Sequence, residues 1–207
     1  MILCDIGNSR MHFFDGERLE HLGFEEGFAR HGSGRVRYIC VNERVRERIG
    51  REAPGWVDVA APQMLRSDYR GLGIDRVAVC LAAEDGVVID AGSAVTVDFM
   101  DRGRHLGGFI WPGIAASRRA YAGISPKLAI GIDPRIPTDR LPLDTAGAVS
   151  FALFAPVKMA VERFAPQRPV TITGGDAPLF APLFPGAKVD ELLVFRGIEK
   201  MLKERGC

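Results

Sequence analysis

Little in the sequence points to secretion, metal binding or a membrane. Its four cysteines have no CxxC spacing, and its four histidines have no metal-ligand spacing. The N-terminus has no basic leader before a long apolar core, and no apolar run reaches the ~18 residues of a membrane span. We therefore expect buried, reduced cysteines and a cytoplasmic protein without a membrane partner.

The chain also carries almost no net charge. The 27 lysines and arginines stand against 26 acidic residues, which leaves a formal charge of +1. Arginines do gather between Arg35 and Arg51, but spaced charges of this kind are typical of a solvated strand edge and helix face. Because this balance gives no broad field to attract nucleic acid, no nucleic-acid partner is expected.

The familiar nucleotide-binding sequences are absent too. The chain has no Walker sequence, no GxGxxG after an expected strand and no HRD set of the protein kinases. A phosphotransferase with this sequence needs another architecture.

The pattern that is present indicates an α/β protein. Hydrophobic residues make up 47% of the chain and charged residues 26%, as in globular proteins. Length alone leaves open one large domain or two small lobes. Strands are expected at residues 2–4, 11–14, 18–22, 36–41, 56–60, 87–90, 94–100, 105–110 and 170–173, and helices at 43–49, 74–83, 114–121, 145–164 (kinked or broken at Pro156) and 191–204.

The turn of the first expected hairpin is unusually rich in polar groups. It reads Asp5-Ile6-Gly7-Asn8-Ser9, although a hairpin turn needs only two residues such as Asn-Gly. The same plan recurs 85 positions later as Asp90-Ala91-Gly92-Ser93, again between an apolar strand and an alternating strand. Either copy alone is typical of an ordinary turn, but the pair indicates two similar lobes.

Polyphosphate binding would explain both turns. The glycine of each turn lacks a Cβ, so backbone N–H groups can approach an anion closely, and the neighbouring Asn and Ser side chains add donors. Asp5 and Asp90 would repel a bare phosphate but suit a cation beside it, since Mg²⁺ prefers carboxylate, water and phosphate oxygens. A third candidate, Gly174-Gly175, could offer bare backbone to a flat adenosine at a helix start, or could be only a tight turn.

Taken in order, these residues resemble the motifs of the type III pantothenate kinase family. Each run is weak alone, but the five in order are specific. The matching runs are Asp5-Ile6-Gly7-Asn8-Ser9, Gly73-Ile74-Asp75-Arg76, Asp90-Ala91-Gly92-Ser93-Ala94-Val95-Thr96, Gly107-Gly108-Phe109-Ile110-Trp111-Pro112-Gly113 and Thr173-Gly174-Gly175.

The resemblance implies a fold and an activity. The fold is that of the acetate kinase, sugar kinase, Hsp70 and actin superfamily, with two ribonuclease-H-like lobes, placed at residues 1–83 and 84–207, and an ATP cleft between them. The activity is ATP-dependent phosphorylation of pantothenate to 4'-phosphopantothenate, the first step of coenzyme A biosynthesis. The family uses Mg²⁺ with ATP and a monovalent cation, K⁺ or NH₄⁺, and forms homodimers.

The resemblance also implies a role for each matching position. Asp75 would be the general base. The phosphate-binding and ATP-binding residues would be Asp5 (near Mg²⁺, through water), Ile6, Gly7, Asn8, Ser9, Arg10, Met11, His12, Gly92, Ser93, Gly174 and Gly175; Asp90 would hold the monovalent cation; and Tyr69, Gly73, Ile74, Asp75, Arg76 and Thr145 would bind pantothenate. Ser9 and Ser93 stand where the family usually has Thr, which keeps the hydroxyl.

The residue types fit this chemistry. In a loose phosphoryl-transfer transition state the attacking hydroxyl loses its proton late, so an ordinary carboxylate suffices as base. Asp75 stands at an expected helix start, where the helix dipole favours its anion, and Arg76 suits a substrate carboxylate. A helix-start acid and a surface salt bridge are the plain structural alternatives for these two residues.

Two other functions stay open. The chain could be another small-molecule kinase of the same superfamily, acting on a sugar or a carboxylic acid, or a nucleotide-binding regulator without kinase activity. The apolar helix expected after Asp144 could equally be a dimer surface or an internal core helix.

Overall fold

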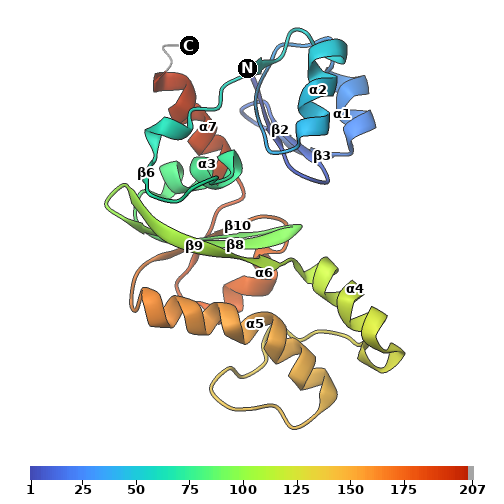
Figure 1. Ribbon diagram of the computed structural model, residues 1–207, viewed down its shortest axis with the longest axis vertical. Helices are drawn as coiled ribbons and strands as arrows, with labels where there is room; N and C mark the ends of the chain where they lie inside the picture. Colours follow the sequence, from blue (N-terminus) through green and yellow to red (C-terminus); the bar gives the residue numbers. More distant parts are fainter. Residues whose placement is uncertain (205–207) are drawn as a thin grey trace. The chain divides into compact units, whose positions relative to one another are not determined.

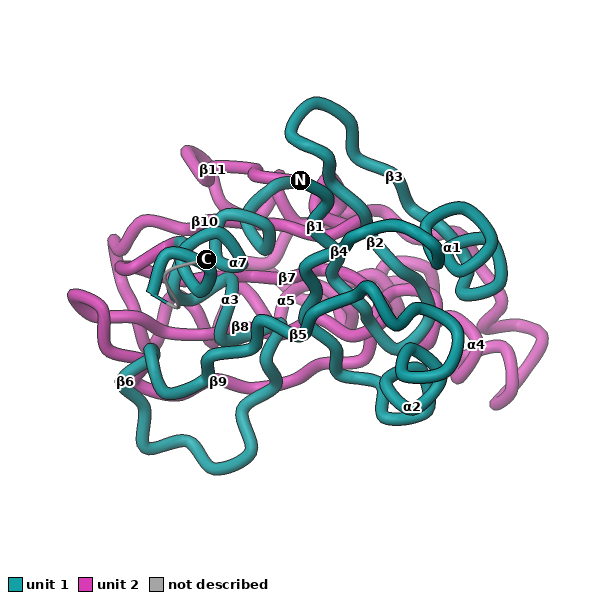
Figure 2. The backbone as a smooth tube through the Cα atoms, turned by 90° about the horizontal axis from the view of Figure 1, so that it is seen from above, with its two compact units in different colours: residues 1–82, 192–207 teal, residues 83–191 magenta. Residues whose placement is uncertain are grey.

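The computed structural model describes residues 1–204 of the chain, which form two compact units. Unit 1 is residues 1–82 with the segment from Leu192 onward, and unit 2 is residues 83–191 (Figure 2). The last helix therefore groups with unit 1, although the predicted lobes divide the chain only once, after residue 83.

Unit 1 contains a five-stranded sheet in the order β3-β2-β1-β4-β5. The first three strands form an antiparallel meander, and β4 and β5 run parallel to β1. The elements of unit 1 (Figure 1) are β1 (Ile2–Ile6), β2 (Met11–Phe14), β3 (Leu19–Leu22), α1 (Phe24–His31), β4 (Val36–Cys40), α2 (Glu43–Glu52), β5 (Val57–Asp58), the 3₁₀ turn η1 (Pro62–Met64), β6 (Arg66–Ser67), α3 (Ile74–Ala83) and α7 (Leu193–Glu204).

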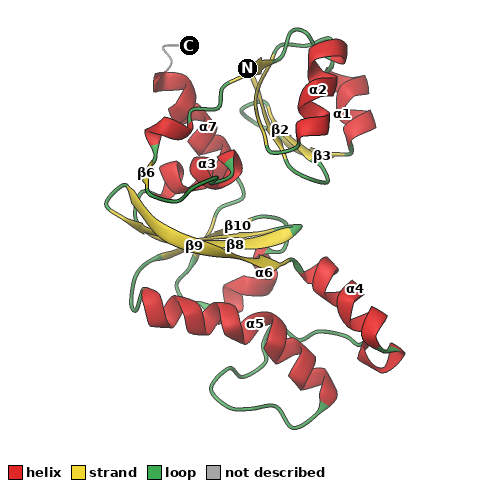
Figure 3. Ribbon diagram, in the orientation of Figure 1, coloured by secondary structure: helices red, strands yellow, loops and turns green. Residues whose placement is uncertain are grey.

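Unit 2 repeats this topology. Its strands follow the order β9-β8-β7-β10-β11, with an antiparallel meander β7–β9 and with β10 and β11 parallel to β7. The five sheet strands of each unit named here thus have the order third, second, first, fourth, fifth, which confirms the prediction of two similar ribonuclease-H-like lobes. The elements (Figure 3) are β7 (Gly86–Ala91), β8 (Ala94–Asp101), β9 (Arg104–Pro112), α4 (Ile114–Ile124), η2 (Pro126–Leu128), α5 (Thr145–Phe164), β10 (Val170–Thr173), α6 (Ala177–Phe180), η3 (Ala181–Leu183) and β11 (Lys188–Val189).

Strand alternation creates the core of unit 1. Residues of β1 and β2 alternate between the two sheet faces, and Ile6 and Phe13 are buried on the face covered by α1 and α2. Helix α1 comes close to this face because Gly27 has no side chain: a Cβ there would collide with the Met11 sulfur. On the other face Phe14 packs against Phe195 of α7, with ring centroids 5.4 Å apart.

The core of unit 2 lies between its sheet and α5. Val95 and Val97 of β8 pack with Leu153, Phe154 and Val157 of the helix. Of the two outcomes expected at Pro156, a kink or a break, the break is wrong, because α5 runs unbroken from Thr145 to Phe164. Apolar side chains on both sides of the proline are buried in one core, and this packing holds the helix together where a hydrogen bond is lost.

Helix α5 is also long and apolar enough, by length and composition alone, to cross a membrane. The sequence-based expectation that no segment reaches that size is therefore wrong. One buried side of α5 belongs to the core cluster of unit 2, which is the packing of a core helix. This favours the core interpretation of the helix over a dimer surface along its length.

The prediction of buried, reduced cysteines is confirmed for the three cysteines among the described residues. Cys4, Cys40 and Cys80 are buried free thiols, and burial raises the pKa of Cys4 well above its usual value. Cys207 lies outside the described residues.

Candidate functional site

The first Asp-x-Gly turn forms a short connection between β1 and β2. The N–H of Gly7 donates to the carbonyl of Arg10 at 3.0 Å and closes the turn. A Cβ at Gly7 would be in ordinary van der Waals contact with the Arg10 carbonyl oxygen, at 3.6 Å, so this backbone is not tightly covered. Asn8, Ser9 and Arg10 are exposed, and Asp5 is half-buried at the end of β1.

Two predicted members of this turn contribute only their backbone. The side chains of Ile6 and Met11 are fully buried in the core of unit 1. Because strand alternation points them away from the face that carries Asp5 and His12, only their N–H and C=O groups can reach a ligand.

Asp75 lies in the first turn of α3, as predicted. Its carboxylate accepts a hydrogen bond from the N–H of Arg76 at 2.8 Å, and it folds back over Gly73, where a Cβ would collide with the Asp75 Oδ1. Gly73 is thus required for the position of the carboxylate rather than for an unusual backbone angle. The helix N-terminus favours the anionic form that a general base needs.

Arg76 and Tyr69 are brought together within unit 1. Arg76 is only 4% exposed, and its guanidinium lies over the Tyr69 ring, 4.9 Å from the centroid. A buried guanidinium stacked on an aromatic ring is fixed in direction, which suits recognition of a carboxylate.

The phosphate turn and the Gly73 segment meet through the end of β4. The Val41 N–H donates to the Ile6 carbonyl at 3.1 Å, and Val41 also lies beside Gly73, with its Cγ1 3.9 Å from where a Cβ of that glycine would stand. Asn42 adds a second link, since its side-chain amide donates to the Asn8 carbonyl at 3.4 Å. Two motifs separated by about 65 positions in the sequence are therefore neighbours in unit 1.

The second Asp-x-Gly turn, in unit 2, is also closed by the N–H of its glycine, but over one residue fewer. The Gly92 N–H donates to the Ala94 carbonyl at 2.9 Å, and Ser93 is exposed. Gly113 packs directly beneath this turn, because a Cβ there would collide with the carbonyls of Gly92 and Ser93. The repeated turn predicted from the sequence is thus a repeated structure.

Asp90 stands beside the predicted adenosine loop. Gly174 has a φ of +89°, and a Cβ there would collide with the Asp90 carboxylate and the Ala91 carbonyl, so only glycine fits. The N–H of Asp176 donates to that same Ala91 carbonyl at 2.8 Å. Gly175, in contrast, has open space around it.

Oxygen ligands for a cation gather next to Asp90. Thr96 lies directly opposite Asp90 on β8, and among the described residues its buried hydroxyl has no hydrogen-bond partner. A carboxylate and an unsatisfied hydroxyl suit a hard cation that takes oxygen ligands. The residues present therefore fit the predicted monovalent cation, and Asp5 with its open, exposed turn fits water-mediated Mg²⁺.

Two titratable groups of these turns are shifted. Burial, with the positive charges of His21 and Arg10, lowers the pKa of His12 to about 4, so this ring is neutral at physiological pH. Burial raises the pKa of Asp176 above its usual value.

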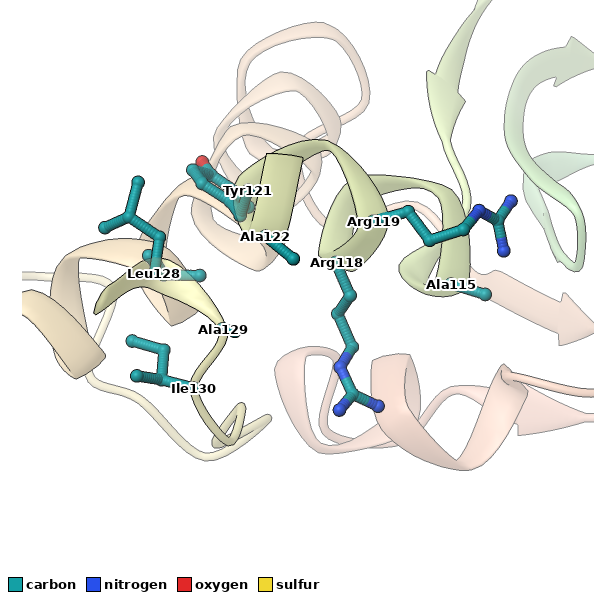
Figure 4. A pocket seen from close by; sticks show the side chains of 9 residues that line it. Ala115, Arg118, Arg119, Tyr121, Ala122, Leu128, Ala129 and Ile130 are labelled. Atoms are coloured by element: carbon teal, nitrogen blue, oxygen red, sulfur yellow. The ribbon is translucent and has the colours of Figure 1, made fainter. Parts of the chain in front are cut away.

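The cavities of unit 2 lie away from most predicted site residues. One of about 310 Å³ is formed by α4, the segment after it and α5 (Figure 4), and Figure 4 shows Arg118 and Arg119 extending from α4 in different directions. A second, of about 400 Å³, has Asp144 and Ala146 in its wall. Thr145 stands between these two residues, exposed at the start of α5, while Asp144 caps that helix through the Gly147 N–H at 2.7 Å.

Sequence reasoning did not assign site roles to Asn42, Thr96 or Gly113. Asn42 caps α2, since its Oδ1 accepts from the Val45 N–H at 3.3 Å. The hydrogen bond from Asn42 to the Asn8 carbonyl joins residues 34 positions apart, and no sequence pattern predicts a contact at that separation. Thr96 and Gly113 lie inside matched motifs, so their motif membership was the available signal.

The fold places the chain in a class of proteins. A solved structure proposed to be a 2-dehydro-3-deoxygalactonokinase from Sinorhizobium meliloti matches with a TM-score of 0.58 and 11% identity, covering 99% of this chain and 98% of that one. At this identity the match concerns the fold alone. The chain thus has the two-lobed fold shared by sugar kinases, Hsp70 and actin, as predicted.

Within that class, the chain belongs to the type III pantothenate kinase family. The family model, described as type III pantothenate kinase, matches residues 40–167. A type III pantothenate kinase of Campylobacter jejuni subsp. jejuni serotype O:2 is 37% identical over 204 residues, covering 99% of this chain and 97% of the relative. The predicted family and its enzyme class, a kinase, are confirmed.

A solved structure agrees over the whole length. It comes from Campylobacter jejuni and is proposed there to be a conserved Baf family transcriptional activator. It matches with a TM-score of 0.87 and 36% identity, covering 100% of this chain and 99% of that chain.

Proposed function

We propose that this chain transfers the γ-phosphoryl group of ATP to the primary hydroxyl of pantothenate. The observation that carries the proposal is the Asp75 carboxylate held over Gly73 in the first turn of α3, next to the stacked Arg76, in a chain of this family. Arg76 takes the substrate carboxylate, and Asp75 takes the hydroxyl proton.

The step balances as an in-line displacement. The pantothenate hydroxyl oxygen forms a bond to the γ-phosphorus while the bond from that phosphorus to the β–γ bridging oxygen breaks, and ADP leaves. The hydroxyl proton passes to Asp75. Tyr69, by stacking on Arg76, limits the directions that the guanidinium can adopt.

Each Asp-x-Gly turn binds phosphate in this proposal, the turn after Asp5 in unit 1 and the turn after Asp90 in unit 2. The Gly7 and Gly92 N–H groups close their own turns, so the other N–H groups of each turn bind phosphate oxygens in this proposal, and Ser9 and Ser93 donate hydroxyls. Mg²⁺, which neutralises phosphate charge when bound, is held near Asp5 through water, and the Gly174-Gly175 backbone receives the adenosine.

A monovalent cation, K⁺ or NH₄⁺, occupies the Asp90 position in this proposal. Support comes from the buried Thr96 hydroxyl directly opposite. With magnesium and ATP fixed, turnover in potassium or ammonium buffer should exceed turnover in sodium-only buffer. Equal rates would remove the role assigned to Asp90.

A homodimer completes the proposal. Leu141 is 77% exposed and Leu143 99% exposed, on the segment that leads to Thr145. Exposed leucines next to a predicted substrate contact suit a face covered by a second copy. We also propose a cytoplasmic location, and the packing of α5 as a core helix of unit 2 is consistent with it.

A panel of acceptors tests the reaction. Mass spectrometry of mixtures with ATP and pantothenate, a sugar or a simple hydroxy acid should show a phosphorylated product with pantothenate. Phosphorylation of another acceptor alone would replace the substrate. Nucleotide binding without any phosphorylated product would favour a nucleotide-binding regulator without kinase activity.

A further inference from the structure

Two helices of unit 1 that are far apart in the sequence touch through their backbones. Helix α7 lies against α3 (Figure 1), and a Cβ at Gly197 would collide with the Ala78 carbonyl. The missing side chain at Gly197 lets the two helices approach more closely than helices with larger side chains at the contact. Ala78 lies three residues after Asp75 in α3, so the contact is about one helical turn from the proposed base.

Helix α7 is also fixed to the sheet that carries the first phosphate turn. Phe195 of α7 is buried and packs on Phe14 of β2, with ring centroids 5.4 Å apart. Strand β2 begins at Met11, directly after that turn. The position of α3 relative to the phosphate turn therefore depends on how α3 is attached to α7.

A second contact between the helices lies at the C-terminal end of α3. The ammonium group of Lys200, on α7, donates to the Leu81 carbonyl at 2.8 Å. Helix α3 ends at Ala83 and has no basic residue in its last turn. The Leu81 carbonyl has no N–H of its own helix to pair with, so Lys200 supplies both the donor and the positive charge that a helix C-terminus favours.

The two contacts together determine the direction of the α3 axis. Ala78 lies midway between Asp75 and Leu81, three residues from each. Because a helix of this length moves as a rigid rod, a shift of the Leu81 end about the Ala78 contact moves the Asp75 end by a similar amount in the opposite sense. A displacement at the capped end is thus transmitted to the carboxylate.

We propose that Lys200 is a positioning residue: by holding the Leu81 carbonyl it fixes the orientation of α3 and thereby places the Asp75 carboxylate. The catalytic consequence rests on the function proposed above, whereas the fixed orientation of α3 does not. Lys200 belongs to none of the matched motifs, and its partner lies 119 positions away in the chain.

Amide spectra test the orientation without any substrate. The N–H groups of Arg76 and Val77 donate to the Asp75 carboxylate and the Gly73 carbonyl at 2.8 and 3.0 Å, so their ¹H–¹⁵N signals report on the first turn of α3. These signals should shift in Lys200→Met, which keeps an aliphatic side chain but has no donor. They should stay near their original positions in Lys200→Arg, which keeps the charge and the donor.

Lys203→Met is the matched control, because it makes the same substitution at an exposed lysine of the same helix. It should leave the two signals unchanged. Signals that do not move in Lys200→Met, or that move equally in Lys203→Met, overturn the inference. If Lys200→Met fails to fold, Lys200→Gln, which has no charge and a shorter side chain, takes its place with the same expected changes.

Kinetics tests the positioning role. Lys200→Met should lower kcat about fivefold, since even a 1 Å misplacement can cost about 10²-fold and this shift is smaller. KM for ATP should stay unchanged because the phosphate turn belongs to the β1–β2 hairpin, and Lys200→Arg should keep kcat within about twofold. A lower melting temperature with a normal kcat would show a merely structural cap and rejects the role. A protein that phosphorylates nothing rejects the proposed function instead, and the amide spectra still decide the orientation of α3.

Discussion

At the scale of single residues, the position of one carboxylate depends on the absence of one side chain. Asp75 folds back over Gly73, in the space that a Cβ would need. Many glycines of the chain, such as Gly50 in α2, have open space instead. The two kinds of glycine look alike in the sequence and differ only in their neighbours.

Gly73→Ala should therefore lower kcat by about tenfold or more, because a displaced base costs much of its catalytic effect. Thermal stability should change little, since the strain is relieved by moving one half-buried carboxylate. Gly50→Ala is the matched control and should leave activity unchanged. A normal kcat in Gly73→Ala would show that the base does not occupy this position.

His12 should make stability depend on pH. Its pKa is lowered from 6.5 to about 4 in the folded protein by burial, His21 and Arg10, so below pH 6.5 the unfolded chain binds a proton that the folded chain does not. Stability is therefore complete above pH 6.5 and is lost as the pH falls toward 4.

Denaturant unfolding at pH 7 and pH 4.5 measures this effect. The protein should lose about 2 kcal/mol more than His12→Asn between the two values. Equal losses in the two proteins would contradict the assignment, since the other titrating groups contribute to both.

At the scale of elements, the hairpins were predictable and several short elements were not. Alternation and Asp-x-Gly turns located β1, β2, β7 and β8 to within about two residues, because those signals are local. Helix α1 went unpredicted because it has no side-chain cap and contains Gly27, a residue that disfavours helices and is explained only by the sheet beneath it.

The site was predictable to a similar extent. Most predicted positions came from a motif. The structure adds the contacts that the motif residues make: Gly174 against Asp90, Val41 beside Gly73, and Asn42 against Asn8. Such contacts depend on topology, which determines neighbours that a linear pattern does not reveal. The two-residue strands β5, β6 and β11 are too short to show any alternation.

Asn42 has two roles, which substitutions can separate: it caps α2 and it supports the phosphate turn. Asn42→Ser keeps a cap, because a serine hydroxyl can accept from the Val45 N–H, but removes the amide that donates to Asn8. We expect unchanged stability and a KM for ATP raised about two- to threefold, since a 3.4 Å hydrogen bond is weak.

Asn42→Ala is the paired variant. It should show the same rise in KM and also lose about 1 kcal/mol of unfolding free energy through the missing cap. If the serine variant binds ATP normally, the contact with Asn8 does not support the turn.

At the scale of the whole molecule, one topology occurs twice in the chain. Strands β1–β5 of unit 1 and strands β7–β11 of unit 2 follow the same order within their sheets, and each first strand leads into an Asp-x-Gly turn closed by its glycine N–H. This repetition explains why the sequence echo at Asp90 was informative although each turn alone was ordinary. The proposed second copy adds a further level of assembly.

The exposed leucines give the test of that assembly. Leu141→Asp combined with Leu143→Asp should shift the protein from dimer to monomer in light scattering after size exclusion, because charges oppose burial of that face. Met159→Asp is the control, because Met159 lies on α5 and is 47% exposed. This variant should leave the mass unchanged. A double variant that stays dimeric places the interface elsewhere.

The central claim is that Asp75 removes the proton of pantothenate as ATP is attacked. Its most direct test is ADP release, measured with and without pantothenate, in the unsubstituted protein and in Asp75→Asn. We predict pantothenate-dependent release in the unsubstituted protein and a kcat lower by about 10²–10⁴-fold in the variant, with both KM values nearly unchanged. Near-normal turnover in Asp75→Asn would contradict the account.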